Sequence, residues 1–474
     1  MLLIMKNNFE QFLNRFEFLE RATELADERQ EELFIVGGYV RDYILDRNRN
    51  EIDFLVVGDS IEYAEELSRS LGVENLTVFK NFGTAHFNYK GIDLEFVGAR
   101  KESYKHNSRN PKVERGTFDD DINRRDFTIN CLAVSLNKKN RGELIDKFGG
   151  VKDIEDKIIR TPLDPYKTFD DDPLRIMRAF RFASQLDFEV DNSVMEAARV
   201  MAERLKIVSQ ERISDEFLKI LASPKPSVGL KLLFESEVLK VVFPEIHNLA
   251  GVDQRKEYHH KDVFQHTCIV VDNVSSVTGD VWLRFAALVH DIAKPQTKKF
   301  IDGIGWSFHG HEELGARMMK QIFDRMKFPL NKLEYVEKLI RLHLRPIALV
   351  DEIVTDSAIR RLIVSADEDL DDLIKLCRAD ITSKNPSKVS RYLENYEIVM
   401  KKVQDVREKD KLRAFQSPVR GEEIMRVCNI PPSKLVGEIK SAIEEAILDG
   451  KIQNNYKDAY QYFLSIKDEF LSKR

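Results

Sequence analysis

Short apolar runs and helical patterns alternate over the first 160 residues. Apolar residues recur at helical spacing over residues 9–26, which predicts an amphipathic helix. The other elements expected here are strands at 33–36 and 52–57 and helices at 39–45 and 61–71. Apolar and polar positions then alternate over 83–89 and 92–97, as in a hairpin with a turn at Lys90-Gly91. These segments predict a small mixed sheet with helices packed on it.

The pattern is helical from about residue 165 nearly to the end of the chain. Breaks fall at 224–227, 242–253 and 431–432, where proline or polar residues interrupt the spacing. The predicted fold class is therefore α+β, with an N-terminal mixed β-sheet and its helices followed by an all-α region.

The composition is that of a soluble, charge-rich globular protein. The 474 residues carry 74 Lys+Arg against 80 Asp+Glu, a net charge of −6, so a nucleic acid would have to meet local basic patches. The sequence has no apolar run near the ~18 residues of a membrane helix, and the apolar start is too short for a signal peptide. The four cysteines are widely separated, which disfavours a disulfide framework or thiolate zinc site and favours a cytoplasmic location.

Gly37-Gly38 joins a predicted strand to a predicted helix near two acidic strands. Glycines allow close backbone approach, and free helix amides suit a phosphate chain. Glu51 and Asp53 are two residues apart, so both carboxylates leave one face of a strand, and Asp93 and Glu95 repeat this spacing. Such carboxylates can hold two Mg²⁺ ions for an in-line phosphoryl displacement. The alternative is a plain turn beside a solvated acidic face.

Basic residues provide further candidates for anion binding. Arg124 and Arg125 match phosphate geometry and Asp126 can accept from a ribose hydroxyl, although a structural salt bridge is equally compatible. Residues 100–115 are strongly basic, which predicts a mobile positive loop over the site or a solvated surface loop. Paired glycines follow Asp146 in a segment that by itself predicts a turn, whereas the family resemblance given below implies a flexible hinge loop there.

Seven of the ten histidines fall between residues 259 and 343, and His290-Asp291 ends an apolar helix expected at 282–289. Imidazoles and carboxylates from neighbouring helices can bind a divalent metal that activates water for phosphoester hydrolysis. The candidate ligands are His266, His290, Asp291, His311 and His343, with Asp380 as a late acid and His259, His260 and His309 as looser candidates. The alternative is a set of structural histidines.

Five motifs, in this order, resemble the class II tRNA nucleotidyltransferase and poly(A) polymerase branch of the DNA polymerase β superfamily. They are GGYVRD at 37–42, EID at 51–53, RRDFTIN at 124–130, DKFGG at 146–150 and DDPLRIMR at 171–178. The remainder looks like the longer bacterial members, which carry an HD domain and a helical tail. The family's metal pair is usually Asp-x-Asp, whereas this chain has Glu51 at the first position. Because Mg²⁺ demands near-ideal octahedral geometry, the longer arm predicts a slower enzyme or a shift toward Mn²⁺.

The resemblance implies four domains. They are a nucleotidyltransferase head at 1–160, a helical neck for base recognition at 161–250, an HD domain at 251–390 and a tRNA-binding helical tail at 391–474. In the tail, seven basic residues at 401–420 and the helix start at 431–437 are candidates for contact with the tRNA acceptor arm, or an ordinary surface.

The resemblance also implies template-independent addition of CCA to the tRNA 3′ end from CTP and ATP with Mg²⁺. The catalytic and Mg²⁺-binding residues would be Glu51, Asp53 and Glu95. Nucleotide binding would involve Gly37, Gly38, Arg41, Arg124, Arg125, Asp126, Asp172, Arg175 and Arg178. Two of these residues, Asp172 and Arg175, are three positions apart on a predicted helix and would share one face. The resemblance implies that this pair selects cytosine and adenine. The alternative is a helix salt bridge.

Three alternatives remain open at this stage. One is a poly(A) polymerase or an enzyme that adds only A or only CC, since the core motifs are shared. Another is an HD-type phosphohydrolase with a divalent transition metal and a decayed transferase site. The third is an RNA-binding chaperone without chemistry. Residues 211–217 resemble a bracing motif of the family and are assigned to scaffolding.

Overall fold

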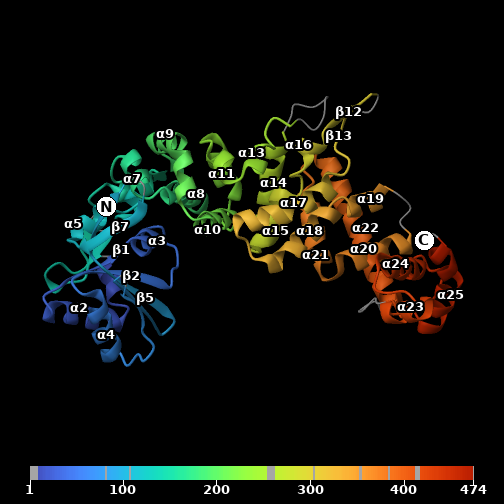
Figure 1. Cartoon of the computed structure of the whole chain (residues 1–474). Helices are drawn as coiled ribbons and strands as arrows, with labels where there is room; N and C mark the ends of the chain where they lie inside the picture. The colour runs from blue at the N-terminus through green and yellow to red at the C-terminus, as the bar shows by residue number, and fades with distance from the viewer. Residues whose placement is uncertain are drawn as a thin grey trace. The chain divides into compact units, whose positions relative to one another are not determined.

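The computed structural model describes residues 9–80, 83–105, 108–252, 262–302, 305–351, 355–382, 385–410 and 417–472. The chain divides into two compact units, Met1–His247 and Asn248–Arg474 (Figure 1). The finer division into four domains stays a prediction. Among the described residues, none of the helices combines the length and apolar character that crossing a bilayer requires.

A seven-stranded mixed sheet forms the core of the first unit, in the order β3-β4-β5-β2-β1-β8-β9. Only β2 and β5 pair in parallel; the other neighbours are antiparallel. The strands are β1 Glu32–Val36, β2 Glu51–Val57, β3 Thr77–Phe79, β4 Thr84–Tyr89, β5 Ile92–Gly98, β8 Ala133–Ser135 and β9 Leu144–Ile145. Phe54 and Phe96 stack across the parallel pair with ring centroids 4.6 Å apart, which anchors the register of the two acidic strands.

Helices cover the sheet and continue beyond it. Their bounds are α2 Glu17–Glu28, α3 Gly38–Ile44, α4 Ser60–Ser70, α5 Phe118–Asn123, α6 Gly150–Glu155, α7 Pro165–Asp171, α8 Leu174–Leu186, α9 Asn192–Met201, α10 Gln210–Leu221, α11 Pro226–Glu235, α12 Val238–Val242 and α13 Pro244–His247. The central helix of this region is α8, which packs against both α10 and α11. A short parallel pair joins β10 Ile158–Ile159 to β11 Glu189–Val190.

Two expectations for the first unit were wrong. The helix expected over residues 9–26 is interrupted, because Phe16 is extended and α2 begins at Glu17; the rings of Phe12 and Phe18 pack on Phe16 at the break. Residues 100–115, expected as a loop, form the hairpin β6 Arg100–Lys105 and β7 Ser108–Arg115. Lys101 lies opposite Glu114 in this ladder, and opposite charges at facing positions stabilise strand pairing.

The second unit is mostly helical. Its helices are α14 Val263–Val277, α15 Val281–Val289, α16 Lys294–Thr297, α17 His311–Met326, α18 Leu333–Leu342, α19 Arg345–Asp351, α20 Asp356–Ala366, α21 Leu370–Ala379, α22 Pro386–Asp410, α23 Gly421–Cys428, α24 Lys434–Leu448 and α25 Tyr456–Ser472. The helical pattern missed a hairpin, β12 Lys299–Ile301 with β13 Gly305–Ser307.

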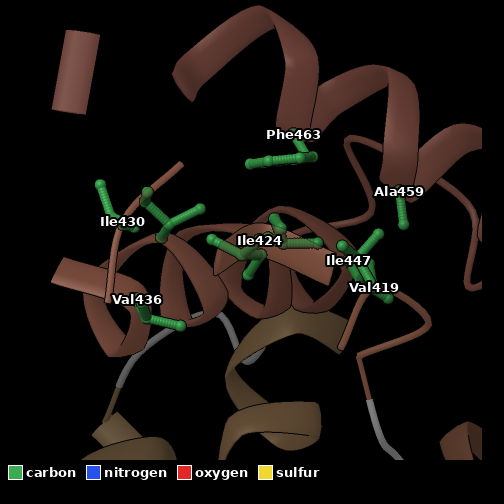
Figure 2. Close-up of a cluster of buried hydrophobic side chains, with 9 residues drawn as sticks. Val419, Ile424, Ile430, Val436, Ile447, Ala459 and Phe463 are labelled. Atoms are coloured by element: carbon green, nitrogen blue, oxygen red, sulfur yellow. The ribbon is translucent and has the colours of Figure 1, made fainter. Parts of the chain in front are cut away.

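Helices α23, α24 and α25 share a hydrophobic core of their own. Figure 2 shows Ala459 and Phe463 of α25 turned toward Ile424 of α23 and Ile447 of α24. Helix α24 buries Ile439, Ile443 and Ile447 at four-residue spacing, as an amphipathic helix does. The predicted tRNA contacts of this tail stay a prediction, and part of the basic stretch at 401–420, residues 411–416, lies outside the described residues.

Candidate functional site

A cavity of about 1050 Å³ opens in the first unit where the sheet meets α8 and α10. Of the residues predicted for nucleotide transfer, all but Glu51 line it: Gly37, Gly38, Arg41, Asp53, Glu95, Arg124, Arg125, Asp126, Asp172, Arg175 and Arg178. Segments spread over some 140 positions of sequence therefore converge on one space.

Three carboxylates gather at the edge of this cavity. The parallel register of β2 and β5 places Glu51 opposite Asp93 and Asp53 opposite Glu95. Glu51, Asp53 and Glu95 each offer an oxygen within 4.8 Å of the other two. Asp93 instead accepts a hydrogen bond of 2.9 Å from Asn88 and stays outside the group. The structure therefore favours Glu95 as the third carboxylate.

The electrostatics of this group fit a divalent cation. Burial, with the charges of Glu51 and Glu95, raises the pKa of Asp53 to about 6 although Arg49 opposes the shift. Burial and Glu51 likewise raise the pKa of Glu95. Crowded carboxylates of this kind are stabilised by a bound cation, and an all-oxygen donor set is the one that Mg²⁺ prefers. Glu51, Asp53 and Glu95 would hold it.

Arg49 is a member of this site that the sequence analysis missed. Its Nη2 lies 2.5 Å from Glu51 and 3.9 Å from Asp53, and its Nη1 lies 3.5 Å from Asp42. The guanidinium thus partly neutralises the acidic group. Arg49 lies just before β2, which begins at Glu51, so strand alternation does not predict this contact, and the sequence offered only the nearness of Arg49 to the acidic strand as a signal.

The Gly37-Gly38 turn brings arginines close to the strand end. Gly37 adopts φ +72° and ψ −129°, a conformation that side chains rarely allow. A Cβ atom at Gly37 would lie 2.8 Å from Nη1 of Arg125, and one at Gly38 would clash with Arg49. Gly37 is therefore favoured by its backbone conformation, whereas a side chain at Gly38 would displace the Arg49 guanidinium from its place beside the carboxylates.

Asp126 is the buried centre of a polar network. Its Oδ1 accepts from Nδ2 of Asn130 at 3.0 Å, and its Oδ2 accepts from Nε of Arg178 at 2.7 Å. Burial alone would raise the pKa of Asp126, yet the charge of Arg178 and these hydrogen bonds lower it to about 2. Arg41 joins the network through Oδ1 of Asn130 at 2.7 Å. Asp126 is therefore an ionised acceptor held rigidly at the cavity wall.

The expectation that Asp172 and Arg175 share a face of one helix was wrong. Helix α7 ends before Asp172, which is extended, and α8 begins after Pro173; a proline disfavours helical conformation in the residue before it. Oδ2 of Asp172 pairs with Arg212 of α10 at 3.3 Å. Arg175 donates to the carbonyl oxygens of Thr168 at 3.2 Å and Arg124 at 2.6 Å. Arg212, which the sequence analysis placed in a scaffold segment, thus lines the cavity beside Asp172.

A buried ion pair braces α8 against α10. Nη1 of Arg181 lies 3.1 Å from Oε1 of Glu216, whose side chain is 4% exposed. This contact supports the scaffolding role given to residues 211–217 for Glu216, whereas Arg212 of the same segment lines the cavity.

Replacement of Glu216 by alanine should lower the free energy of unfolding by about 3 kcal/mol, because it leaves the Arg181 charge buried without its partner. Urea unfolding followed by circular dichroism measures this. Asp215→Ala on the same helix removes only an exposed pair with Lys219 and should change stability by less than about 1 kcal/mol. Equal effects of the two substitutions would contradict the bracing role.

The second unit gathers the predicted histidine and aspartate residues into one cluster. They form two groups of possible ligands, His266, His290 and Asp380, and Asp291, His311 and His343. The late acid Asp380 belongs to the cluster, with Oδ1 2.8 Å from Nε2 of His266. His309 is exposed and outside both groups, and His259 and His260 lie outside the described residues.

All four histidines of the cluster are oriented in the same way. The Nδ1 atoms of His290, His311 and His343 lie 2.8, 2.8 and 2.6 Å from the carbonyl oxygens of Ala287, Phe308 and Ile340. Nδ1 of His266 lies 2.9 Å from the hydroxyl of Thr382. Each carbonyl accepts from a protonated Nδ1 and so turns Nε2 toward the interior of the cluster, which is how protein metal sites orient their histidine ligands.

The interior of the cluster fits a divalent metal. Nε2 of His290 is buried without a hydrogen-bond partner of good geometry, although Asp291 lies 3.2 Å away. Burial lowers the pKa of His343 to about 4, while Asp291 and Asp380 overcome burial and raise the pKa of His290 to about 10. Mixed imidazole and carboxylate donors suit transition metals. Either group of three residues would hold a divalent metal, which would supply an activated water for phosphoester hydrolysis.

Comparisons with known proteins agree with a nucleotide-transfer site in the first unit and a histidine–aspartate cluster in the second. Residues 33–160 match the poly(A) polymerase head domain, residues 187–249 the probable RNA and SrmB-binding site of polymerase A, and residues 263–384 the HD domain. The multifunctional CCA protein of Methylococcus capsulatus is 33% identical over 366 residues, which cover 73% of this chain and 81% of that protein. The chain belongs to the tRNA nucleotidyltransferase and poly(A) polymerase family.

Other relatives of this enzyme differ in what their names say they add. The A-adding tRNA nucleotidyltransferase of Deinococcus radiodurans is 30% identical over 71% of this chain and 76% of that protein. The A-adding enzyme of Aquifex aeolicus is 42% identical, but the match spans only 40% of this chain and 24% of that protein.

Solved structures share the fold of the enzyme. A tRNA nucleotidyltransferase complexed with a primer tRNA and an incoming ATP analogue has a TM-score of 0.58 and 26% identity over 80% of this chain and 99% of that chain. The apo form of a CCA-adding enzyme has a TM-score of 0.62 at 24% identity, covering 96% and 94% of the two chains.

Proposed function

We propose that the enzyme completes the 3′-terminal CCA of tRNA from CTP and ATP, with Mg²⁺ held by Glu51, Asp53 and Glu95. The observation that carries the proposal is the single cavity shared by acidic strands, arginines and the Asp126 network. The match to a multifunctional CCA protein over 81% of its length supports the substrate.

Different residues around the cavity bind the triphosphate, the ribose and the base of the nucleotide. Arginines at its wall attract the triphosphate, because guanidinium donors match phosphate oxygens. The ionised Asp126, held by Arg178, accepts from a ribose hydroxyl. Asp172 and Arg212 offer an acceptor and a donor for the base edge. When bound, Mg²⁺ supplies activation of the attacking hydroxyl and charge neutralisation at the triphosphate.

The proposal is tested with tRNA transcripts that end before C74, before C75 and before A76, incubated with Mg²⁺ and labelled CTP and ATP. We expect all three to reach a CCA end, with little use of UTP or GTP and no further growth. Addition of A alone would replace the proposal with an A-adding enzyme, and an extended A tail with a poly(A) polymerase.

Glu51→Asp should raise the rate with Mg²⁺ several-fold and lower the ratio of the Mn²⁺ to the Mg²⁺ rate. The reason is that the shorter arm restores the usual ligand length, and Mg²⁺ tolerates non-ideal geometry poorly. Initial rates of CTP incorporation with each ion measure the effect. A rate ratio identical to that of the unaltered enzyme would show that Glu51 places its carboxylate as well as an aspartate does.

We infer a second activity, hydrolysis of phosphoesters at RNA 3′ ends, from the histidine–aspartate cluster. Its support is the position of four histidine Nε2 atoms within 4 Å of the carboxylates of Asp291 and Asp380. Hydrolysis of a terminal 3′-phosphate releases inorganic phosphate and leaves the free 3′-hydroxyl that nucleotide addition requires. Hydrolysis of a 2′,3′-cyclic phosphate frees the same hydroxyl when water breaks the bond from phosphorus to O3′ and the phosphate stays on O2′. Incubation of RNA carrying each end with the enzyme and Ni²⁺, Mn²⁺ or Mg²⁺ tests this activity.

A further inference from the structure

The β12–β13 hairpin of the second unit presents aromatic rings to solvent. Phe300 is 47% exposed and Trp306 is 38% exposed. They are facing partners in the antiparallel register, so both rings lie on one face of the hairpin, with centroids 5.3 Å apart. Trp282, the other tryptophan of the chain, is 9% exposed. In Figure 1 the hairpin stands out from the neighbouring helices of its unit.

Lysines accompany these rings. Nζ of Lys298 lies 4.4 Å from the centroid of the Trp306 ring. Lys299 is exposed on the opposite face, and Asp302 is the acidic residue of this segment. Exposed aromatic rings with interspersed cations are typical of surfaces that bind single-stranded nucleic acid, because bases stack on the rings and phosphates meet the charges.

A second lysine and a second aromatic ring lie in contact between the hairpin and the histidine–aspartate cluster. Nζ of Lys294 lies 5.6 Å from the centroid of Phe308 and 2.6 Å from Oδ2 of Asp291. The carbonyl oxygen of Phe308 lies 2.8 Å from Nδ1 of His311. The strand that carries Trp306 therefore continues directly into residues that orient the cluster.

We propose that the hairpin is a binding platform for the single-stranded 3′ end of an RNA, which it directs to the cluster. Phe300 and Trp306 stack on bases, and Lys298, beside the Trp306 ring, lies near a phosphate. Lys294 is already paired with Asp291, but a purely apolar partner would leave Lys298 without a counter-charge, so the surface favours nucleic acid. The direction toward the cluster rests on the second proposed activity, whereas RNA binding is independent of it.

The fluorescence of the full-length enzyme tests the binding directly, since Trp306 is its exposed tryptophan. An eight-nucleotide single-stranded RNA added without metal should quench the emission. The quench should disappear in Trp306→Phe, and a fully paired RNA duplex should compete poorly. Absence of a quench, or equal competition by the duplex, would overturn the proposal.

The double substitution Phe300→Ala/Trp306→Ala should weaken binding of the labelled RNA about tenfold or more in a competition assay. Phe79→Ala is the matched control, because Phe79 is 49% exposed on β3 of the first unit, and it should leave affinity unchanged. The alternative partner of the hairpin is a second copy of the chain, and light scattering measures whether the enzyme is a dimer. If the double variant loses a dimer but keeps its affinity for RNA, the hairpin is a protein interface and the proposal is overturned. Hydrolysis of RNA 3′ phosphates by the same preparations is recorded separately, so failure of the second proposed activity is distinguishable from failure of RNA binding by the hairpin.

Discussion

Asp53→Asn is expected to lower the rate of nucleotide incorporation about a thousandfold or more. Asp53 is the central carboxylate of the group, paired with Glu95 across the parallel strands and two residues from Glu51. Its loss removes a ligand from a cation whose stabilisation of the transition state is worth several kcal/mol, and 1.36 kcal/mol corresponds to a tenfold change in rate. Initial rates of labelled ATP incorporation into tRNA measure the effect.

Asp93→Asn is the matched control for this substitution. Asp93 lies on β5 two residues from Glu95 and opposite Glu51, but it bonds to Asn88 and is 49% exposed. We expect a rate within a few-fold of the unaltered enzyme. Similar losses of rate in Asp53→Asn and Asp93→Asn would show that the total negative charge of β2 and β5 matters more than which carboxylates bind the cation. A small loss in Asp53→Asn would remove Asp53 from the metal site.

Asp291→Asn is expected to abolish metal retention by the second unit and to lower hydrolysis of RNA 3′ phosphates at least a hundredfold. Asp291 lies 3.3 Å from His311 and 3.2 Å from His290, so its carboxylate links the two ligand groups. Removing the charge takes a ligand from the metal and thereby weakens activation of its bound water. Metal content by mass spectrometry and release of phosphate are the two readouts.

The substitution also leaves the Lys294 charge without its partner, so a second variant separates folding from ligation. Asp380→Asn alters a carboxylate that is 28% exposed and contacts His266 and His290. It should show the same losses with little change in thermal stability. His309→Ala, an exposed histidine beside the cluster, should retain both metal and hydrolysis. Full metal content in Asp291→Asn and Asp380→Asn would refute the assignment.

The spacing of apolar residues along the sequence predicted many of the strands and helices. Period-two and helical spacing identified β2, β4, β5 and α15 close to their observed bounds, because burial of one face imposes these periods on the sequence. Patterns failed where charged residues form structure, as in the β6–β7 hairpin, whose polar and basic strands lack the alternation of apolar and polar residues by which a strand is identified. The β12–β13 hairpin was missed for a related reason, since its short strands expose most of their residues.

The sequence by itself determined which chemistry the chain carries. It placed two carboxylates on one strand face, arginines beside an aspartate and a dense set of histidines, because spacing along a regular element dictates direction. Only the tertiary structure decided which distant groups meet. The parallel register of β2 and β5 chose Glu95 over Asp93, Pro173 separated Asp172 from the helix of Arg175, and α10 brought Arg212 to Asp172. Such encounters depend on strand pairing and helix packing between remote segments, which local spacing does not encode.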